Sequence, residues 1–584
     1  MRDAVLQVRT QRHQFELTLY SQSCTRFSMT PTTQVRAPIL SLLLGLLLGL
    51  ILARHCSAPL PLLLCVACIG SVAALRLAGN ERLQWLWMLC FLISTTHCCW
   101  AYGQLRLPAK PQAYNLTLPA REAQLAIEIQ SVMQPGERYG KPSGLARVLD
   151  APITSRIHPG EQIYFKLTLP PAAEQTAALN IQRGLQLQTT GVLTPILPPA
   201  TNSDEDDFEA YLQSIGVHYR FDRTGPLQTL RAPVALDRFY TALNQRFQAT
   251  LRLGAPKNSE LPNVYVAMLL GRKIELSKAQ IERYRMTGTM HFFAISGLHI
   301  GVIATVIAQF LLLIRVPRAV GPWLGLPLVY LYVEITGGAP SAMRAFLMAA
   351  FFWSSFACQR QRSPFSALIC SAILVLIIDP NQLWSLGFQL SYTVVLSILL
   401  FGLPLHQVLT RRYQPYRWLP EQDWNPRQRA FAWSLDKVLL LFAISFSAWL
   451  ASTPLSAGLF EFVAPGAIFL NMLLVYLVAI VISGGVISLA CATALLFGLA
   501  GFVNHSAWTV IYLMDHMVIF CAQLPGAILP SEGFSAALSY SALCVYFATL
   551  LWLHRRAARL QGHAMWLPPL IIISLVTTGL AVID

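Results

Sequence analysis

The chain has 584 residues, of which 55% are hydrophobic and 12% are charged, against about 25% charged residues in an average soluble domain. This composition excludes an ordinary soluble globular protein and indicates that lipid surrounds most of the chain. The net charge of +15 sits mainly in short arginine-containing loops between apolar runs. That distribution is the positive-inside pattern of membrane topology, so the charge does not by itself indicate nucleic-acid binding.

Residues 1–38 are mostly polar and contain several arginines, which predicts a cytoplasmic N-terminal segment that is not a cleaved signal peptide. Residues 39–103 contain three apolar runs and are predicted to form three transmembrane helices, at 39–53, 60–75 and 83–103. The 12 cysteines all lie outside residues 103–290, mostly within apolar runs, so we expect them to pack as small apolar side chains and not to form disulfides.

Residues 104–235 are polar, and three preceding spans place them on the side opposite the arginine-rich N-terminus. Polar and apolar residues alternate at 124–129 and at 162–169, which predicts short strands of a small β-barrel or sandwich. Residues 236–290 form an amphipathic helical connector of the kind that lies on a membrane surface, with its apolar face at Phe239, Leu243, Phe247 and Leu251.

Residues 291–584 form a second hydrophobic block, and the predicted fold class is therefore an α-helical polytopic membrane protein with an inserted small all-β domain. Its candidate spans are 292–314, 319–336, 342–358, 364–379, 386–402, 437–456, 466–484, 485–503, 506–523, 536–553 and 565–582. Five of them lie between loops 411–429 and 555–559, which both have cytoplasmic charge. Because five is odd, one segment between Ala467 and Leu524 must be re-entrant, split or fused differently.

Polar residues within the second block are candidates for function, because polar groups are costly in lipid. Ser296 and His299 lie three residues apart and share one helix face. They fit a nucleophile pair, a structural hydrogen-bonding pair or the lining of a hydrated path. Gly297 and Gly301 form a G-x-x-x-G pattern, which allows a second helix to approach closely.

This segment resembles the signature of the ComEC competence family. Thr287-Gly288-Thr289-Met290-His291 leads into Ala294-Ile295-Ser296-Gly297-Leu298-His299-Ile300-Gly301, which is similar to the family's T-G-T-x-H and A-I-S-G-L-H-V-G stretches. Other elements follow in family order: Asp207 to Gly216 without the leading Phe, Leu269 to Arg272 without the acidic residue, Thr336 to Ala345, Asp379 to Tyr392, Thr453 to Leu455, and Asn471.

The resemblance and the chemistry of these elements give further channel-lining or helix-packing candidates beside His291. Pro340 suits a helix start, and Ser341 and Arg344 share a face one turn apart. Arg344 needs either an anion such as a DNA phosphate or an ion pair with Glu334 or Asp379.

Two neutral side chains, Gln389 and Ser391, lie in an otherwise apolar span. They fit a pore lining that binds weakly, and equally a hydrogen bond to a neighbouring helix. Asp515 and His516 match no element of the family pattern with confidence and stay unassigned.

The resemblance implies an inner-membrane channel that takes up single-stranded DNA, preceded by an extracytoplasmic OB-like domain that receives the strand by stacking and backbone contacts. No histidines lie two residues apart, so we expect a form lacking the family's C-terminal metallo-β-lactamase-like domain, with no catalytic residue, metal or cofactor. A nuclease, a DNA receptor and a cytoplasmic helicase or ATPase are then separate partners, beside the lipid bilayer and a homo-oligomer. A transporter or flippase for another substrate is the alternative, and a hydrolase built on Ser296 is a minor one.

Overall fold

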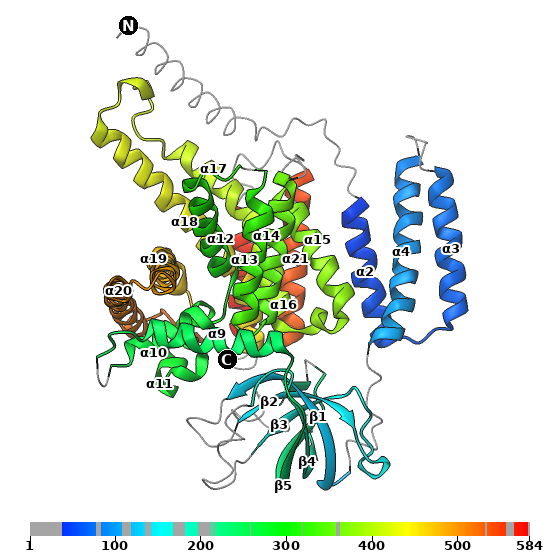
Figure 1. Ribbon diagram of the computed structural model, residues 1–584. Coiled ribbons are helices and arrows are strands. Elements are labelled where there is room, and N and C mark those ends of the chain that lie inside the picture. Colours follow the sequence, from blue (N-terminus) through cyan, green and yellow to red (C-terminus); the bar gives the residue numbers. More distant parts are fainter. Residues whose placement is uncertain are drawn as a thin grey trace. The chain divides into compact units, whose positions relative to one another are not determined.

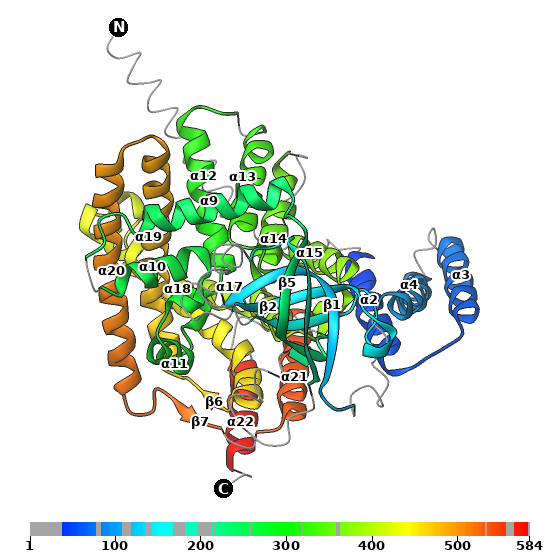
Figure 2. The ribbon, with the colours of Figure 1, turned by 60° about the horizontal axis from the view of Figure 1, so that its bottom comes forward.

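The structure is a computed structural model, and Figures 1 and 2 show its elements. It describes residues 38–77, 83–107, 118–134, 142–167, 181–196, 209, 212–213, 216–256, 259–317, 319–357, 363–531, 534–555 and 566–581. The predicted N-terminal segment 1–38 lies almost wholly outside these residues, as does most of the Asp207 to Gly216 element. The chain divides into two compact units, Met1–Tyr102 and Gly103–Asp584.

The first unit contains the three predicted N-terminal spans. They are α2 (Pro38–His55), α3 (Leu60–Leu77) and α4 (Gln84–Arg106), the last of which runs into the second unit. Small residues let these helices approach: Gly45 and Gly49 of α2 lie against α4. The Ser94 hydroxyl of α4 donates to the carbonyl of Ala67 in α3 at 2.8 Å. The helices α2, α3 and α4 are thus held together by small side chains and a buried hydroxyl, as is common between membrane helices.

The second unit begins with the predicted β-barrel. Its strands are β1 (Arg121–Gln134), β2 (Ser143–Asp150), β3 (Gln162–Lys166), β4 (Gln186–Pro195) and β5 (Tyr219–Arg231). They close in the order β1-β2-β3-β5-β4, with β3 and β5 parallel and the other neighbours antiparallel. Alternate side chains, such as Leu125 and Ile127, fill the interior completely. The predicted small all-β domain is confirmed, with the partly Greek-key order of an OB-like barrel.

Three helices connect the barrel to the second block. They are α9 (Ala235–Leu251), α10 (Leu261–Leu270) and α11 (Lys278–Met286), and the short turn η4 (Met290–Phe293) follows. Only α9 has the expected amphipathic character along its length. The helix α10 is apolar all round, and Val264 to Leu270 are at most 2% exposed, so it lies in the core and not on a membrane surface.

The described residues of the second hydrophobic block are mostly helical, and Figure 1 shows α12, α13, α14 and α16 side by side. Its long elements are α12 (Gly297–Leu313), α13 (Gly321–Ile335), α14 (Pro340–Ala357), α15 (Pro364–Ile378), α16 (Leu386–Ser397), the π-turn η6 (Ile398–Gly402), α17 (Leu403–Arg412), α18 (Pro426–Leu459), α19 (Ala467–Thr493), α20 (Phe497–Gln523), α21 (Ala536–Arg555) and α22 (Leu567–Ala581). Among the described residues, five helices are long and apolar enough to cross a membrane, in agreement with a multi-pass membrane protein.

The odd number of spans has a simple origin. The segments predicted at 466–484, 485–503 and 506–523 are two helices, α19 and α20, which lie side by side in both views. Gly484 and Gly485 lie inside α19, where Gly485 makes room for the side chain of Leu269. The break comes at Leu495, which has a positive φ of 61°. Four helices, an even number, therefore separate the two arginine-rich loops.

Candidate functional site

The T-G-T motif ends α11. The Thr287 hydroxyl donates to the carbonyl of Arg283 at 2.8 Å, and the hydroxyls of Thr287 and Thr289 are 2.9 Å apart. Gly288 between them has a φ of 70°, a conformation that suits glycine at the end of a helix. His291 is exposed, and its Nδ1 lies 2.8 Å from the Gly288 carbonyl. The motif thus turns the chain sharply from α11 toward α12.

Ser296 precedes α12, and His299 is in its first turn. The Ser296 hydroxyl lies 3.0 Å from His299 Nδ1, and the Ser296 backbone N–H donates to the same nitrogen at 3.3 Å. His299 is fully buried, and its Nε2 faces the Met268 backbone of α10 without a well-formed hydrogen bond. No carboxylate of the described residues hydrogen-bonds this imidazole. The pair therefore stabilises the start of the helix, as a capping box does.

Gly297 and Gly301 face open space. No heavy atom of the described residues lies within 4 Å of a Cβ built on either glycine. Both residues are exposed on α12. The close approach of a second helix that the G-x-x-x-G pattern predicts is therefore not found among the described residues.

Arg344 lies in the second turn of α14, which starts at Pro340 as expected. Its side chain is buried, with 4% exposed, and its Nε has no hydrogen-bond partner in the described chain. Its Nη1 approaches Gln382 Oε1 at 3.4 Å, a long hydrogen bond. None of the ion pairs found between described residues includes Arg344. The guanidinium is therefore a buried cation beside neutral groups. Ser341 is half-buried near the start of the same helix.

The two carboxylates expected to pair with Arg344 have other partners. Glu334 of α13 is 8% exposed and accepts from Arg183 of the barrel at 3.0 Å. Asp379 accepts from the backbone of Asn381 at 3.1 Å and from the side chain of Gln382 at 3.0 Å. Asp379 thus orients the amide that meets Arg344 and does not neutralise the guanidinium directly.

Gln389 lies on α16, two residues after Gly387. Its amide donates to the carbonyl of Leu383 at 3.1 Å and accepts from the Tyr540 hydroxyl of α21 at 3.0 Å. A Cβ built on Gly387, in the same helix, would lie 3.2 Å from Arg344 Nη2. Arg344, Gln382 and Gly387 therefore form one cluster, which we call the Arg344 cluster. Ser391 is half-buried one turn further along α16.

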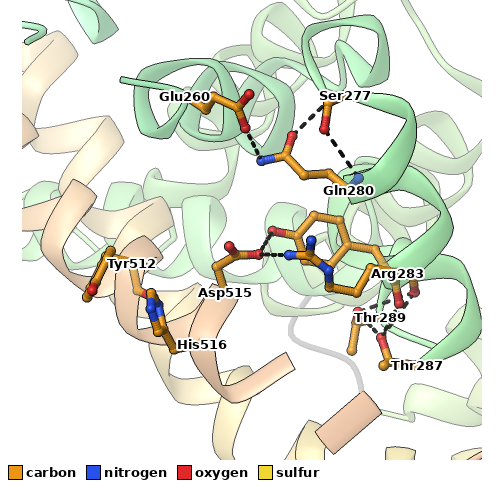
Figure 3. A network of polar contacts seen from close by, with 10 residues as sticks. Glu260, Ser277, Gln280, Arg283, Thr287, Thr289, Tyr512, Asp515 and His516 are labelled. Atoms are coloured by element: carbon orange, nitrogen blue, oxygen red, sulfur yellow. Dashed lines mark hydrogen bonds and ion pairs between the residues drawn. The ribbon is translucent and has the colours of Figure 1, made fainter. Parts of the chain in front are cut away.

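A second polar cluster joins α11 to α20, and Figure 3 shows it. Asp515 accepts from the Tyr284 hydroxyl at 2.8 Å and from Arg283 at 3.4 Å. Nearby, the Gln280 amide donates to Glu260 at 3.0 Å. His516 bonds only to its own helix, at the Tyr512 carbonyl. In this Asp515 cluster, Asp515 is therefore paired with an opposite charge, Arg283, whereas Arg344 contacts only a neutral amide among the described residues.

The Asp515 cluster supports the T-G-T turn, because Arg283 and Tyr284 immediately precede it in α11. The sequence left Asp515 unassigned, although an acidic residue within a membrane helix is itself a signal. Its partners lie more than 230 residues away along the chain. No hydrogen bond found among the described residues connects the Ser296–His299 pair to the Arg344 cluster.

The barrel surface differs from the expected stacking platform. Its four described aromatic side chains, Tyr164, Phe165, Tyr219 and Phe221, are all buried. Stacking on successive bases requires exposed rings. The described strands therefore do not supply the predicted stacking contacts.

Residues 268–556 match the family model for competence proteins. This region starts at Met268, whose backbone His299 faces, and contains both Arg344 and Asp515. The chain belongs to the competence protein family. The matched region of this competence protein lies in the helical block and excludes the strands of the barrel.

Among curated proteins, this competence protein is 27% identical over 239 residues to ComE operon protein 3 of Bacillus subtilis, covering 41% of the chain and 30% of that relative. It is 24% identical over 314 residues to Recombination protein 2 of Haemophilus influenzae, covering 50% and 35%. It is 27% identical over 172 residues to the uncharacterized protein YcaI of Escherichia coli, covering 28% and 21%. These alignments cover about a third of the relatives' length or less. No solved structure matches the chain.

Proposed function

We propose that this protein is an inner-membrane channel through which single-stranded DNA enters the cell during natural transformation. Membership of the competence family and the multi-pass helical block support this function. The name of one relative, Recombination protein 2, agrees with a role in handling DNA.

The observation that carries the proposal is Arg344. A buried guanidinium without a carboxylate is costly in a membrane protein, and an anion would compensate it. Among the described residues, the side-chain hydrogen bond found for Arg344 is the long one to Gln382 Oε1, at 3.4 Å. A phosphate of a passing strand would gain a charge-assisted hydrogen bond from the free Nε. The neighbouring groups are neutral, which allows the phosphate to leave again, as conduction requires.

The barrel has a supporting role in this proposal. Because its described aromatic rings are buried, we propose that it guides the strand through polar and backbone contacts. Arg183 connects it to Glu334, which lies six residues before Pro340, the first residue of α14. The barrel is thereby linked to the helix that carries Arg344.

No catalytic step belongs to the proposal. The Ser296–His299 pair caps α12, and the buried His299 has no orienting carboxylate in the described chain. Degradation of the second strand and the driving force are assigned to separate proteins, a nuclease and a helicase or ATPase.

The proposal is tested by deleting the gene in a naturally competent host and supplying labelled duplex DNA. We expect DNA to bind at the cell surface as before, while label protected inside the cytoplasm and transformants both disappear. DNA introduced by electroporation should still recombine, which separates uptake from later steps. Normal transformation by the deletion strain would refute the channel, and loss of a different transported solute would favour the transporter or flippase.

A further inference from the structure

An apolar stripe runs along α9, and the helical bundle covers only its C-terminal half. Its residues recur at helical spacing, at Leu236, Phe239, Leu243, Phe247 and Leu251. Leu251 is fully buried, and Phe247 packs against the core cluster that contains α10 and part of α19. At the other end, Leu236 is 56% exposed and Phe239 is 52% exposed. The N-terminal half of the stripe therefore extends beyond the helical bundle.

The covered half of the stripe fixes the direction of the exposed half. Residues three and four apart lie on one helix face, so Leu236 and Phe239 point to the same side of α9 as Phe247 and Leu251. That side faces the helical bundle. Figure 2 shows α9 running near α12 and α13, and contacts join it to α13 and α19.

One hydrogen bond fixes the depth of α9. The Asn244 side chain, near the middle of α9, donates to the carbonyl of Ile335 at 2.7 Å. Ile335 is the last residue of α13, one of the apolar helices of the bundle. Residues 319–336 are predicted from the sequence to span the membrane, so the contact with Ile335 places α9 at the predicted boundary between hydrocarbon and headgroups.

The remaining faces of α9 are polar or occupied. Arg238 and Gln245 are exposed away from the stripe, whereas Arg246 is exposed at the edge of the stripe, seven residues from Phe239. Asp237 lies against Gly184 of the barrel. The barrel therefore contacts a different face from the one that carries Leu236 and Phe239. A helix with one apolar face, one charged face and this depth is typical of an interfacial membrane helix.

We infer that the N-terminal half of α9 is a lipid-binding surface, with Leu236 and Phe239 inserted into the bilayer leaflet on the barrel's side. The lipid contact continues the surface of a multi-pass bundle and needs no second protein. The strand β5 ends at Arg231 and α9 begins at Ala235, so the inserted helix holds the base of the barrel at the membrane. This inference does not depend on what the channel transports.

The test replaces single residues of the full-length protein by the photo-crosslinker p-benzoylphenylalanine, in membranes that contain an alkyne-labelled phospholipid. Phe239 is the test position. Gln245, which is exposed on the opposite face of α9, is the matched control, and Phe310, exposed on α12, is the positive control.

Illumination should link lipid to position 239 about as strongly as to position 310, and much more strongly than to position 245. Lipid capture at position 239 no greater than at position 245 would overturn the inference. So would a product in which position 239 is linked to a second protein chain.

Discussion

The Arg344 and Asp515 clusters both place charges inside the helical block, but only one of them is balanced. Asp515 accepts from Arg283 and Tyr284, and each partner belongs to α11. Arg344 has a free Nε and one long contact to a neutral amide. A paired charge fastens one helix to another, whereas an unpaired buried cation offers a position to a ligand. The comparison predicts that the two clusters respond in opposite ways to mutation.

The largest effect is expected for Arg344→Gln. Losing a charge-assisted hydrogen bond to phosphate is worth about 1.5–3 kcal/mol, so transformation should fall about 10-fold to 100-fold. The thermal unfolding midpoint in detergent should stay the same or rise, because an uncompensated buried charge is removed. Arg344→Lys, which keeps a charge but not the planar group, should fall between wild type and Gln. A parallel loss of stability and uptake would mean that Arg344 is structural.

Asp515→Ala should instead lower stability, by about 2 kcal/mol, because it leaves Tyr284 and Arg283 without their acceptor. Uptake should fall only as far as folded protein is lost. His516→Ala is the matched control, since His516 is exposed and bonds only to its own helix. Thermal unfolding midpoints of both variants in detergent measure this difference in stability. An Asp515 variant of normal stability that transports no DNA would remove the distinction between the clusters.

The sequence predicts each cluster only partly, and the reason is distance along the chain. Period-two alternation correctly predicted the barrel, and apolar runs predicted most spans. The break between α19 and α20 was missed because it falls at Leu495, an apolar residue that gives no breaking signal. Arg344 was recognised as needing a partner, but Glu334 pairs with Arg183, which is 151 residues away. Pairing across such distances is a tertiary property that local pattern does not contain.

The Ser296–His299 pair contains no ion pair, unlike the Asp515 cluster. Variants of this pair should lower stability less than Asp515→Ala does. Ser296→Ala removes a capping side chain and should cost about 1 kcal/mol of stability. Ser296→Asn, which also caps helices well, should restore most of the loss. Thermal unfolding of the two variants measures this difference. If Ser296→Ala kept full stability but lost activity, Ser296 would have a direct functional role.

The smallest effect is expected for the ion pair of Arg183 and Glu334. Arg183 is about half exposed and Glu334 is buried, so this pair is less shielded from solvent than a fully buried one. Solvent screens the exposed partner, so the coupling energy should be only about 0.5 kcal/mol in a double-mutant cycle of Arg183→Ala and Glu334→Gln. Arg183→Ala alone should destabilise more than the double variant, because it leaves the Glu334 carboxylate buried and unpaired. Equal stability of the single and double variants would contradict this reading. Glu334 would then tolerate an unpaired buried charge, and an unpaired Arg344 would not by itself require an anion.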